Sequence, residues 1–289
     1  MHFTLTDDFD AVKIAASGQC FRWYPLSDGR CRIFARDRTV VLKQTAPDTL
    51  ELDCTPEEFQ SFWHDYFDFS TDYTAIRALI DPDDHYLSQS AACGQGIRIL
   101  RQDPFEMLIT FLLSQRKSIP AIQKSVEALS RAAGTPIGEA DGQTLYAFPT
   151  PAQLAALDDD TLAACGLGYR LPYIRQASQT AAHNSSLFDD LAALDDAALR
   201  EKLLSLHGVG PKIAQCVMLF GFHRMDSFPL DVWMNRVMDT HYPNGFPFDR
   251  YAPFNGVIQP QAPPSPLGRS QYDLALKALS GRLPPHKEG

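Results

Sequence analysis

The chain lacks features that mark several common classes of protein. Its six cysteines never stand in a C-x-x-C spacing, which argues against a zinc ribbon, a thioredoxin motif and a cysteine-ligated cluster. No run approaches about 18 consecutive apolar residues, so we expect no membrane-spanning helix. The N-terminus has two adjacent acids and no apolar core, unlike a secretory signal. We therefore expect a cytoplasmic protein with reduced thiols and no metal or cofactor.

An excess of positive charge is also missing. The 289 residues include 26 Lys and Arg against 35 Asp and Glu, a net charge of −9. This balance weighs against nucleic-acid binding by bulk charge, but not against a small, locally basic site. The acid is segregated, because residues 48–84 hold eleven acids and one base, whereas residues 98–131 hold six bases and three acids. Such runs are also what solvated helix faces look like.

The hydrophobic patterns predict an α+β protein. Residues 20–52 alternate short apolar or β-branched runs with turn dipeptides, which is typical of antiparallel hairpins. Residues 56–90 contain helical spacing, and from about residue 101 almost every segment reads as a helix of ten to fifteen residues. We expect an N-terminal antiparallel β-sheet domain followed by a mainly α-helical domain.

The domain boundaries follow from composition. After about residue 243, Pro, Gly, Asn and Gln crowd together, a composition typical of a loop. The length suits about two domains. We predict a sheet domain at 1–95, a helical domain at 96–245 and a Pro-rich C-terminal segment at 246–289.

Residues 203–214 show a helix-hairpin-helix pattern. A helix is followed by a tight turn at Gly208 and Gly210, and Pro211 opens a second helix. The glycines permit a sharp hairpin and leave N–H groups uncovered at a helix N-terminus, where a phosphate oxygen binds well. An ordinary helix C-cap followed by a turn gives the same spacing.

Lys212 and Asp231 are the candidate chemical pair. Lys212 lies in the first turn of the second helix, where the helix dipole disfavours a cation. This position together with apolar walls around the amine should lower the pKa of Lys212, and an unprotonated amine is a nucleophile. Asp231 is explained simply as the N-cap of the next helix. A helix of about ten residues and a short return loop would also bring the two helix N-termini together.

Several segments along residues 1–245 carry a family resemblance: SGQCFRW at 17–23, YFDFSTDY at 66–73, FLLSQRKSIPAI at 111–122, GLGYR at 166–170, and HGVGPKIAQCVMLFGF with FPLDVW after it. Together they resemble the helix-hairpin-helix DNA glycosylases with a Gly/Pro-rich loop and catalytic Asp (HhH-GPD). They are most similar to the 8-oxoguanine DNA glycosylase/lyase branch, bacterial type.

The resemblance implies base-excision repair of damaged double-stranded DNA, without a cofactor. Lys212 would attack C1′ of the damaged nucleotide, displace the base and form a Schiff base, after which β-elimination nicks the strand. Asp231 would stabilise the positive charge that develops on the sugar. The nucleotide must first be flipped out of the duplex. The family implies a nucleoid-associated monomer with no membrane partner.

The resemblance also implies a base pocket. Gly18 matches the glycine whose carbonyl accepts a hydrogen bond from N7–H of 8-oxoguanine, although an ordinary turn explains the same residue. Cys216 matches a cysteine stacked on the flipped base, and its alternative is a packed core thiol. Gln259 belongs to Gly256–Gln259, which matches the Gly-x-x-Gln of the helix that closes the pocket.

The remaining matches concern DNA outside the pocket. Tyr169 matches the residue wedged at the lesion, and Arg170 matches the residue that reads the orphaned partner base. An exposed aromatic in a surface loop is the simpler interpretation of Tyr169. Gly208 and Gly210 would present backbone N–H groups to a phosphate.

This chain departs from the family pattern at three places. Arg116 and Lys117 replace the usual Asn-Asn, and their charge could serve phosphates. Ala121 replaces an Arg that reads cytosine in eukaryotic members, so we predict a weaker preference for cytosine opposite the lesion. Position 263 is Pro where the pocket helix should carry an aromatic. A rival match, Gly268–Gln271, has Ala275 at that place.

Two other interpretations remain at this point. An alkylpurine glycosylase uses the Asp but no Lys, so Lys212 speaks against it. A non-catalytic or decayed helix-hairpin-helix DNA-binding protein would need neither residue.

Overall fold

The computed structural model describes residues 1–260. They form two compact units: Met1–Ile33 with Thr39–Arg98, and Phe34–Arg38 with Ile99–Gln259. An antiparallel sheet comes first and helices dominate the second unit, which confirms the predicted α+β class. No helix within residues 1–260 is long and apolar enough to cross a membrane.

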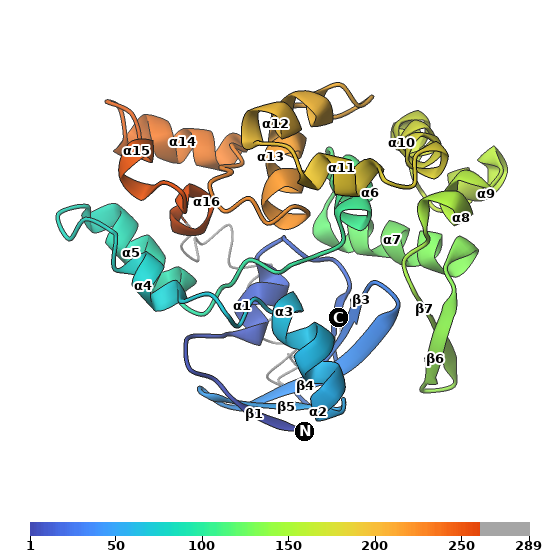
Figure 1. Ribbon diagram of the computed structural model, residues 1–289, viewed down its shortest axis with the longest axis horizontal. Helices are drawn as coiled ribbons and strands as arrows, with labels where there is room; N and C mark the ends of the chain where they lie inside the picture. Colours follow the sequence, from blue (N-terminus) through green and yellow to red (C-terminus); the bar gives the residue numbers. More distant parts are fainter. Residues whose placement is uncertain (261–289) are drawn as a thin grey trace, which may run out of the picture. The chain divides into compact units, whose positions relative to one another are not determined.

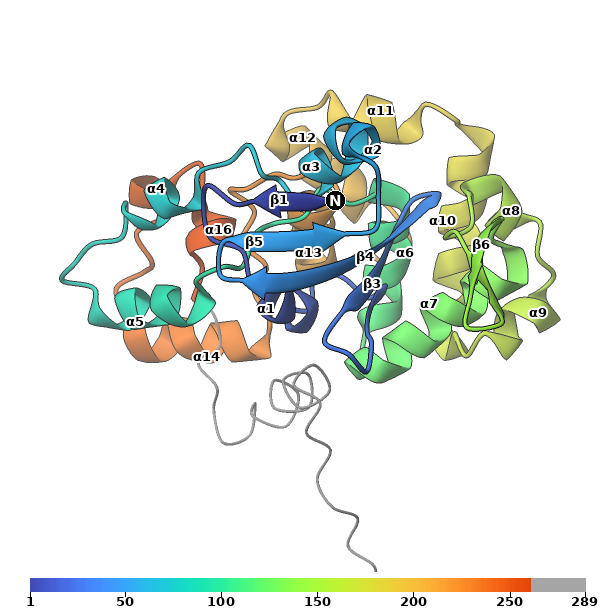
Figure 2. The same cartoon turned by 90° about the horizontal axis from the view of Figure 1, so that it is seen from below.

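The five-stranded sheet has the order β1-β5-β4-β3-β2. Figure 2 shows β1, β5, β4 and β3 in that order. Its strands are β1 (His2–Thr4), β2 (Trp23–Pro25), β3 (Cys31–Ala35), β4 (Arg38–Ala46) and β5 (Thr49–Leu52). β2, β3, β4 and β5 lie within residues 20–52, where the sequence predicts hairpins. β1 lies before the predicted range and pairs antiparallel with β5, placing Phe3 opposite Leu50.

Helices complete the N-terminal unit: α1 (Ala11–Ala16), α2 (Pro56–Glu58), the π-helix η1 (Phe59–Trp63), α3 (His64–Tyr66), α4 (Tyr73–Arg77) and α5 (His85–Gly94). The core follows from alternation in the strands and helical spacing after residue 55. Val40 and Leu42 are buried on one face of β4, and Trp63 is fully buried. Trp23 donates its indole N–H to the Tyr66 hydroxyl at 3.0 Å.

Arg98 anchors the N-terminal segment of this unit. Its guanidinium is buried and donates to Asp7 at 3.1 Å, to the Asp8 carbonyl at 2.8 Å and to the Asp68 carbonyl at 3.0 Å. It also lies 4.4 Å from the centre of the Tyr73 ring. A buried cation needs such partners, because an unpaired charge in a core is very costly.

Helices dominate the second unit: α6 (Pro104–Ser114), α7 (Ile119–Ala133), α8 (Pro151–Ala155), α9 (Asp159–Ala164), the 3-10 turn η2 (Gly168–Arg170), α10 (Leu171–His183), α11 (Leu187–Ala192), α12 (Asp196–Leu204), α13 (Pro211–Phe220), α14 (Val232–His241), α15 (Phe248–Tyr251) and α16 (Asn255–Ile258). Nearly all of α6 is buried, as its continuous apolar sequence predicts. α13 contacts both α6 and α12 (Figure 1).

Two parts of this unit differ from the expectation. A β-hairpin, β6 (Pro136–Ala140) with β7 (Gln143–Tyr146), interrupts the helices. Its turn is Asp141-Gly142, and both residues adopt positive φ. The stretch after residue 243 was expected to be loop, yet it contains α15 and α16. Apolar packing explains the difference, because Phe246, Phe248 and Tyr251 form ring contacts there.

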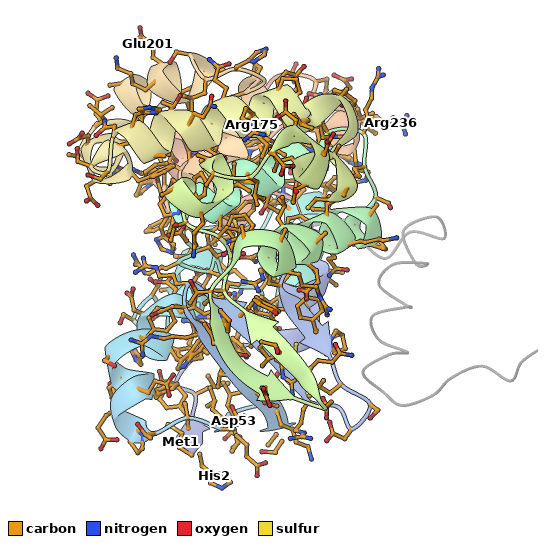
Figure 3. All side chains as sticks on the ribbon, turned by 90° about the vertical axis from the view of Figure 1, so that its right-hand side faces the viewer. Met1, His2, Asp53, Arg175, Glu201 and Arg236 are labelled. Atoms are coloured by element: carbon orange, nitrogen blue, oxygen red, sulfur yellow. The ribbon has the colours of Figure 1, made fainter. Side chains whose placement is uncertain are left out.

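Arg175 ties the helix pair α8 and α9 to α10. Its guanidinium, labelled in Figure 3, donates to the Asp159 carboxylate at 3.1 Å and to the Ala155 carbonyl at 3.3 Å. α9 leads directly into the segment 166–170. Arg175 therefore helps to fix the start of the loop 166–170, which the sequence predicts to contact DNA.

Candidate active site

The predicted hairpin joins α12 to α13. Gly208 has φ +86°, and a Cβ on it would lie 2.5 Å from the Tyr173 ring, so both conformation and space require glycine. Val209 is buried beneath the turn. Gly210 is the N-cap of α13 with φ −93°, and a Cβ on it would meet nothing within 4 Å. Backbone conformation and packing therefore explain why residue 208 is glycine, but they do not explain why residue 210 is.

Lys212 and Asp231 come together as the sequence predicts. The Lys212 Nζ lies 3.9 Å from Oδ2 of Asp231. Their side chains are 52% and 46% exposed, so the amine is not enclosed by apolar walls. An exposed ion pair of this kind stabilises a fold by less than about 1 kcal/mol. The pair is better placed to meet a ligand than to hold helices together.

Asp231 is both a helix cap and the partner of the lysine. Its Oδ1 accepts a hydrogen bond from the Met234 N–H at 2.8 Å, which fixes the carboxylate at the start of α14. Oδ2 is the oxygen nearer to Lys212. Asp231 therefore both caps α14 and pairs with Lys212, and the sequence left both of these interpretations open.

Cys216 lies one turn after Lys212 on α13 and is buried. Burial raises the pKa of its thiol to about 12; the charge of Lys212 lowers this pKa to a smaller extent and the charge of Asp231 raises it. The thiol is thus neutral at physiological pH, as the packed-core alternative predicts. The four-residue spacing on α13 places it on the same helix face as Lys212.

α16 carries the predicted pocket glutamine at its end. Gly256 has no room for a Cβ, which would collide with the Ser227 carbonyl. Its N–H donates to the Met225 carbonyl at 2.8 Å, so α16 is held against the loop that precedes Asp231. Gln259 follows α16, and among residues 1–260 its buried Oε1 has no hydrogen-bond donor. Positions 263, 268–271 and 275 lie outside the described residues.

Arg116 and Lys117 point to different roles. Arg116 is exposed and has φ +51°, a conformation that costs a non-glycine residue energy. Lys117 turns inward, and its amine donates to the Ser125 hydroxyl at 2.5 Å and the Gly166 carbonyl at 2.8 Å. Burial and the nearby charge of Arg170 lower the pKa of Lys117. Lys117 holds the loop at 166 rather than offering a free cation.

Tyr169 and Arg170 also differ in how far their side chains are exposed. Tyr169 is 52% exposed, as a wedge or a surface aromatic would be. Arg170 is only 7% exposed and lies 4.3 Å from the centre of the Tyr169 ring. Its guanidinium donates to the carbonyls of Gln115, at 2.9 Å from Nε, and Leu167, at 3.3 Å. In this conformation Arg170 supports Tyr169 and presents little of itself to a partner base.

Gln115 is a connecting residue that the sequence interpretation missed. Its carbonyl accepts from Arg170 at 2.9 Å and from the Tyr169 hydroxyl at 3.4 Å. Its side-chain amide donates to the Gly208 carbonyl at 3.3 Å. Gln115 therefore links the α6–α7 junction, the 166–170 loop and the hairpin. Gln115 stands within the segment 111–122 that resembles the family, but its sequence position does not show which carbonyl and side chain it contacts.

Gly18 belongs to the N-terminal unit. Its φ of +79° requires glycine, although a Cβ would meet nothing within 4 Å. The next residue, Gln19, is held in place because its side-chain amide donates to the Arg98 carbonyl at 2.9 Å. These contacts are those of a tight turn, the alternative that the sequence left open. No group of three or more His, Cys, Asp or Glu within residues 1–260 is arranged to hold a metal ion.

A hairpin followed by a helix with a lysine in its first turn, and an aspartate that caps the next helix, is the arrangement expected of a helix-hairpin-helix DNA glycosylase. Two family models match the chain. The first is the 8-oxoguanine DNA glycosylase N-terminal domain, over residues 3–108. The second is the HhH-GPD superfamily base excision DNA repair protein, over residues 109–245. The chain belongs to the 8-oxoguanine DNA glycosylase family within the HhH-GPD superfamily.

Individual relatives agree with this membership. A probable N-glycosylase/DNA lyase of Methanothermobacter thermautotrophicus is 30% identical over 269 residues, covering 82% of this chain and 83% of the relative. The 8-oxoguanine glycosylase/lyase of Clostridium acetobutylicum, solved with DNA containing cytosine opposite 8-oxoguanine, is 28% identical with a TM-score of 0.81; the match covers 98% of this chain and 99% of that chain. MBOgg1, solved with a low-affinity DNA ligand, is 34% identical with a TM-score of 0.79, covering 97% and 96%.

Proposed function

We propose that this protein excises 8-oxoguanine from duplex DNA and then nicks the strand at the abasic site. The observation that carries the proposal is the pairing of Lys212 with Asp231 at 3.9 Å, at the N-termini of α13, which follows the hairpin, and of α14. The relatives named N-glycosylase/DNA lyase support the same reaction.

The geometry suits a nucleophilic amine. The Lys212 nitrogen bonds to C1′ as the C1′–N9 bond breaks, and the electron pair of that bond leaves with the base, which takes up a proton. The bound nitrogen then loses one proton and the sugar ring opens as O4′ takes up a proton, which gives a protonated Schiff base. Removal of a C2′ proton then expels the 3′ phosphate. The lysine side chain is long and exposed enough to reach a flipped nucleotide.

Asp231 has an electrostatic role in this scheme. One carboxylate oxygen is held by the Met234 N–H, so the other keeps its direction when the substrate arrives. A negative charge fixed in advance stabilises the cationic sugar that develops as the base departs. The bound DNA would exclude water from the half-exposed pair and strengthen this interaction.

Base recognition is assigned to Gly18, Cys216 and Gln259. The buried Oε1 of Gln259 has no donor among residues 1–260, and the N1–H and 2-amino groups of an 8-oxoguanine base would supply one. The Gly18 carbonyl would accept N7–H, which guanine lacks. The Cys216 thiol, neutral and buried, would offer the base a soft contact.

The DNA contacts are assigned to the exposed side chains of Arg116 and Tyr169 and to the backbone at Gly208 and Gly210. Lys117 and Arg170 would act by supporting those contacts. The protein would act as a monomer on damaged double-stranded DNA. A repair enzyme works where its DNA lies, so a cytoplasmic, nucleoid-associated location is part of the proposal.

Borohydride trapping tests the reaction. The protein is incubated with a duplex that contains one 8-oxoguanine, with and without sodium borohydride, beside an undamaged duplex. We expect a covalent protein–DNA adduct on the damaged duplex, absent in Lys212→Gln. Binding without an adduct or base release would instead support a non-catalytic binding protein. Release of methylated purines without an adduct would support an alkylpurine glycosylase.

A further inference from the structure

The loop from Met225 to Asp231 is held from two sides. On one side, Gln215 of α13 accepts a hydrogen bond from the Phe228 N–H at 3.1 Å. On the other side, the Gly256 N–H of α16 donates to the Met225 carbonyl at 2.8 Å. The loop that ends at the candidate catalytic carboxylate is therefore fixed to α13, which carries Lys212, and to α16, which leads to Gln259.

The side chain of Asn255 joins α16 to this loop and to the start of α15. Its Nδ2 donates to Asp226 Oδ1 at 2.6 Å and to the Phe248 carbonyl at 3.1 Å. Its backbone N–H approaches the same Asp226 oxygen at 3.4 Å. Asn255 is 2% exposed and Asp226 is half-buried, so this charge-assisted bond is partly shielded from water and stronger than one on the open surface.

The contact has a direct geometric consequence. Asn255 precedes Gln259 by one helical turn, and Asp226 precedes Asp231 by five residues. Gly256 packs so closely on Ser227 that it leaves no space for a methyl group. A small shift of α16 along the loop would therefore move the glutamine amide relative to the Lys212–Asp231 pair. Catalytic geometry is sensitive to displacements of about 1 Å.

We propose that Asn255 is a positioning residue for base recognition: through Asp226 it sets Gln259 at the correct distance from the catalytic pair. This inference rests on the proposed function. It assigns a role to two residues that carry no recognised motif. Neither residue contacts the substrate in this scheme, so the effect of changing them passes through Gln259.

Two substrates separate positioning from general damage to the fold. Excision of 8-oxoguanine requires the base contact of Gln259, whereas cleavage of a preformed abasic site requires Lys212 and Asp231 but no base. For Asn255→Asp, which sets a carboxylate against Asp226, we expect single-turnover excision to fall about tenfold to a hundredfold. Abasic-site cleavage should stay within about twofold of the original protein. Gln259→Leu should give the same pattern.

A double variant provides the matched control. In Asn255→Asp with Asp226→Asn, the amide and the carboxylate exchange places while the bond to the Phe248 carbonyl stays lost, so we expect excision to recover at least about threefold over Asn255→Asp. Asn255→Ser is a second, smaller variant that cannot reach Asp226 and should behave like Asn255→Asp. Melting temperatures of all variants are measured alongside.

The outcomes distinguish the two proposals. Unchanged excision in Asn255→Asp overturns the positioning role, and so does an equal fall of excision and abasic-site cleavage. Failure of the double variant to recover removes Asp226 from the scheme and with it the inference. If the unaltered protein releases no 8-oxoguanine, the proposed function itself is wrong, and the role of Asn255 in it falls too.

Discussion

One carboxylate of this protein faces two partners: Oδ1 of Asp231 accepts the Met234 N–H at 2.8 Å, and Oδ2 lies 3.9 Å from Nζ of Lys212. The direction of the second oxygen is thereby set by the first. A substitution at Asp231 can remove the charge, the cap or both, and the two losses have different consequences.

Asp231→Asn should remove the charge and keep the cap, because the amide oxygen still accepts the Met234 N–H. We expect the free energy of unfolding to change by less than about 0.5 kcal/mol. Excision of 8-oxoguanine should slow by about a hundredfold to a thousandfold, the usual effect of removing one electrostatic stabiliser. Asp231→Ala should lose both, with a further destabilisation of about 1 kcal/mol. Urea denaturation and single-turnover rates measure the two effects. A large loss of stability in Asp231→Asn would contradict this division.

Gly208→Ala and Gly210→Ala should separate fold from DNA binding. At Gly208 the methyl group meets the Tyr173 ring at 2.5 Å and φ is +86°, so we expect a destabilisation of about 1–3 kcal/mol. At Gly210 the space is open, and stability should change by less than about 1 kcal/mol. Affinity for duplex DNA should nevertheless fall about tenfold in Gly210→Ala, because the methyl group stands where a phosphate would approach the N–H groups. Fluorescence anisotropy with a labelled duplex measures the affinity, and a thermal melt measures the stability. Unchanged affinity in Gly210→Ala would show that the phosphate binds elsewhere.

Arg116→Gly and Lys117→Met should have opposite effects. Glycine relieves the positive φ at position 116, so stability should not fall, while the slope of log K against log salt should drop by about one as a phosphate contact is lost. Methionine at 117 removes the bonds to Ser125 and Gly166 and should destabilise by about 1–2 kcal/mol with the slope unchanged. Binding titrations between low and moderate salt provide the test. A lower slope in Lys117→Met would show that its amine meets DNA after all.

Ala121 should weaken the preference for cytosine opposite the lesion. Eukaryotic members of the family place an arginine there, and an arginine that reads a base is worth about 1–3 kcal/mol of discrimination. We expect excision rates to differ little among the four opposite bases, and Ala121→Arg to raise the rate opposite cytosine selectively. Single-turnover rates on four duplexes measure this. A strong cytosine preference in the unaltered protein would mean that other residues read the partner base.

Asp7 should make the N-terminal unit sensitive to acid. Burial alone would raise the pKa of Asp7, but hydrogen bonds from Thr74 and the Tyr73 N–H, with the charge of Arg98, lower it below 3.8. A folded-state pKa below the unfolded value adds stability that is present above the unfolded pKa and is lost as pH falls through the folded one. Asp7→Asn should therefore cost about 1–3 kcal/mol at pH 7, with a smaller difference below pH 3.8. Denaturation at both pH values tests this. A constant difference would contradict the linkage.

Much of the fold was predictable because its signals are local. Alternation around Val40 and Leu42 indicated a strand, and the continuous apolar sequence of α6 indicated a central helix. The three-residue strand β1 is too short to show alternation. The hairpin at Asp141-Gly142 did carry a turn signal, but the helical segments around it dominated the interpretation. α15 and α16 were missed because proline and glycine suggest a loop, whereas ring packing around Phe246 stabilises short helices.

The approach of Lys212 to Asp231 was predictable, because each residue has a reactive side chain and stands at a recognisable helix N-terminus. Their approach follows from the helix and loop lengths between them. The inward turns of Lys117 and Arg170 were not predictable, because a sequence shows that a residue is charged but not which carbonyls surround it. Gln115 and Asn255 act through tertiary hydrogen bonds, and no spacing in the sequence reports those.

The dependence of the hairpin on distant residues limits how far its motif can be moved. The turn at Gly208 rests on the Tyr173 ring and receives the Gln115 amide, and neither residue belongs to the twelve residues that define the pattern. A transplanted copy of that segment on another helical scaffold would lack both supports. Design of a portable DNA-binding hairpin from this protein therefore needs the ring and the amide to be carried along with it.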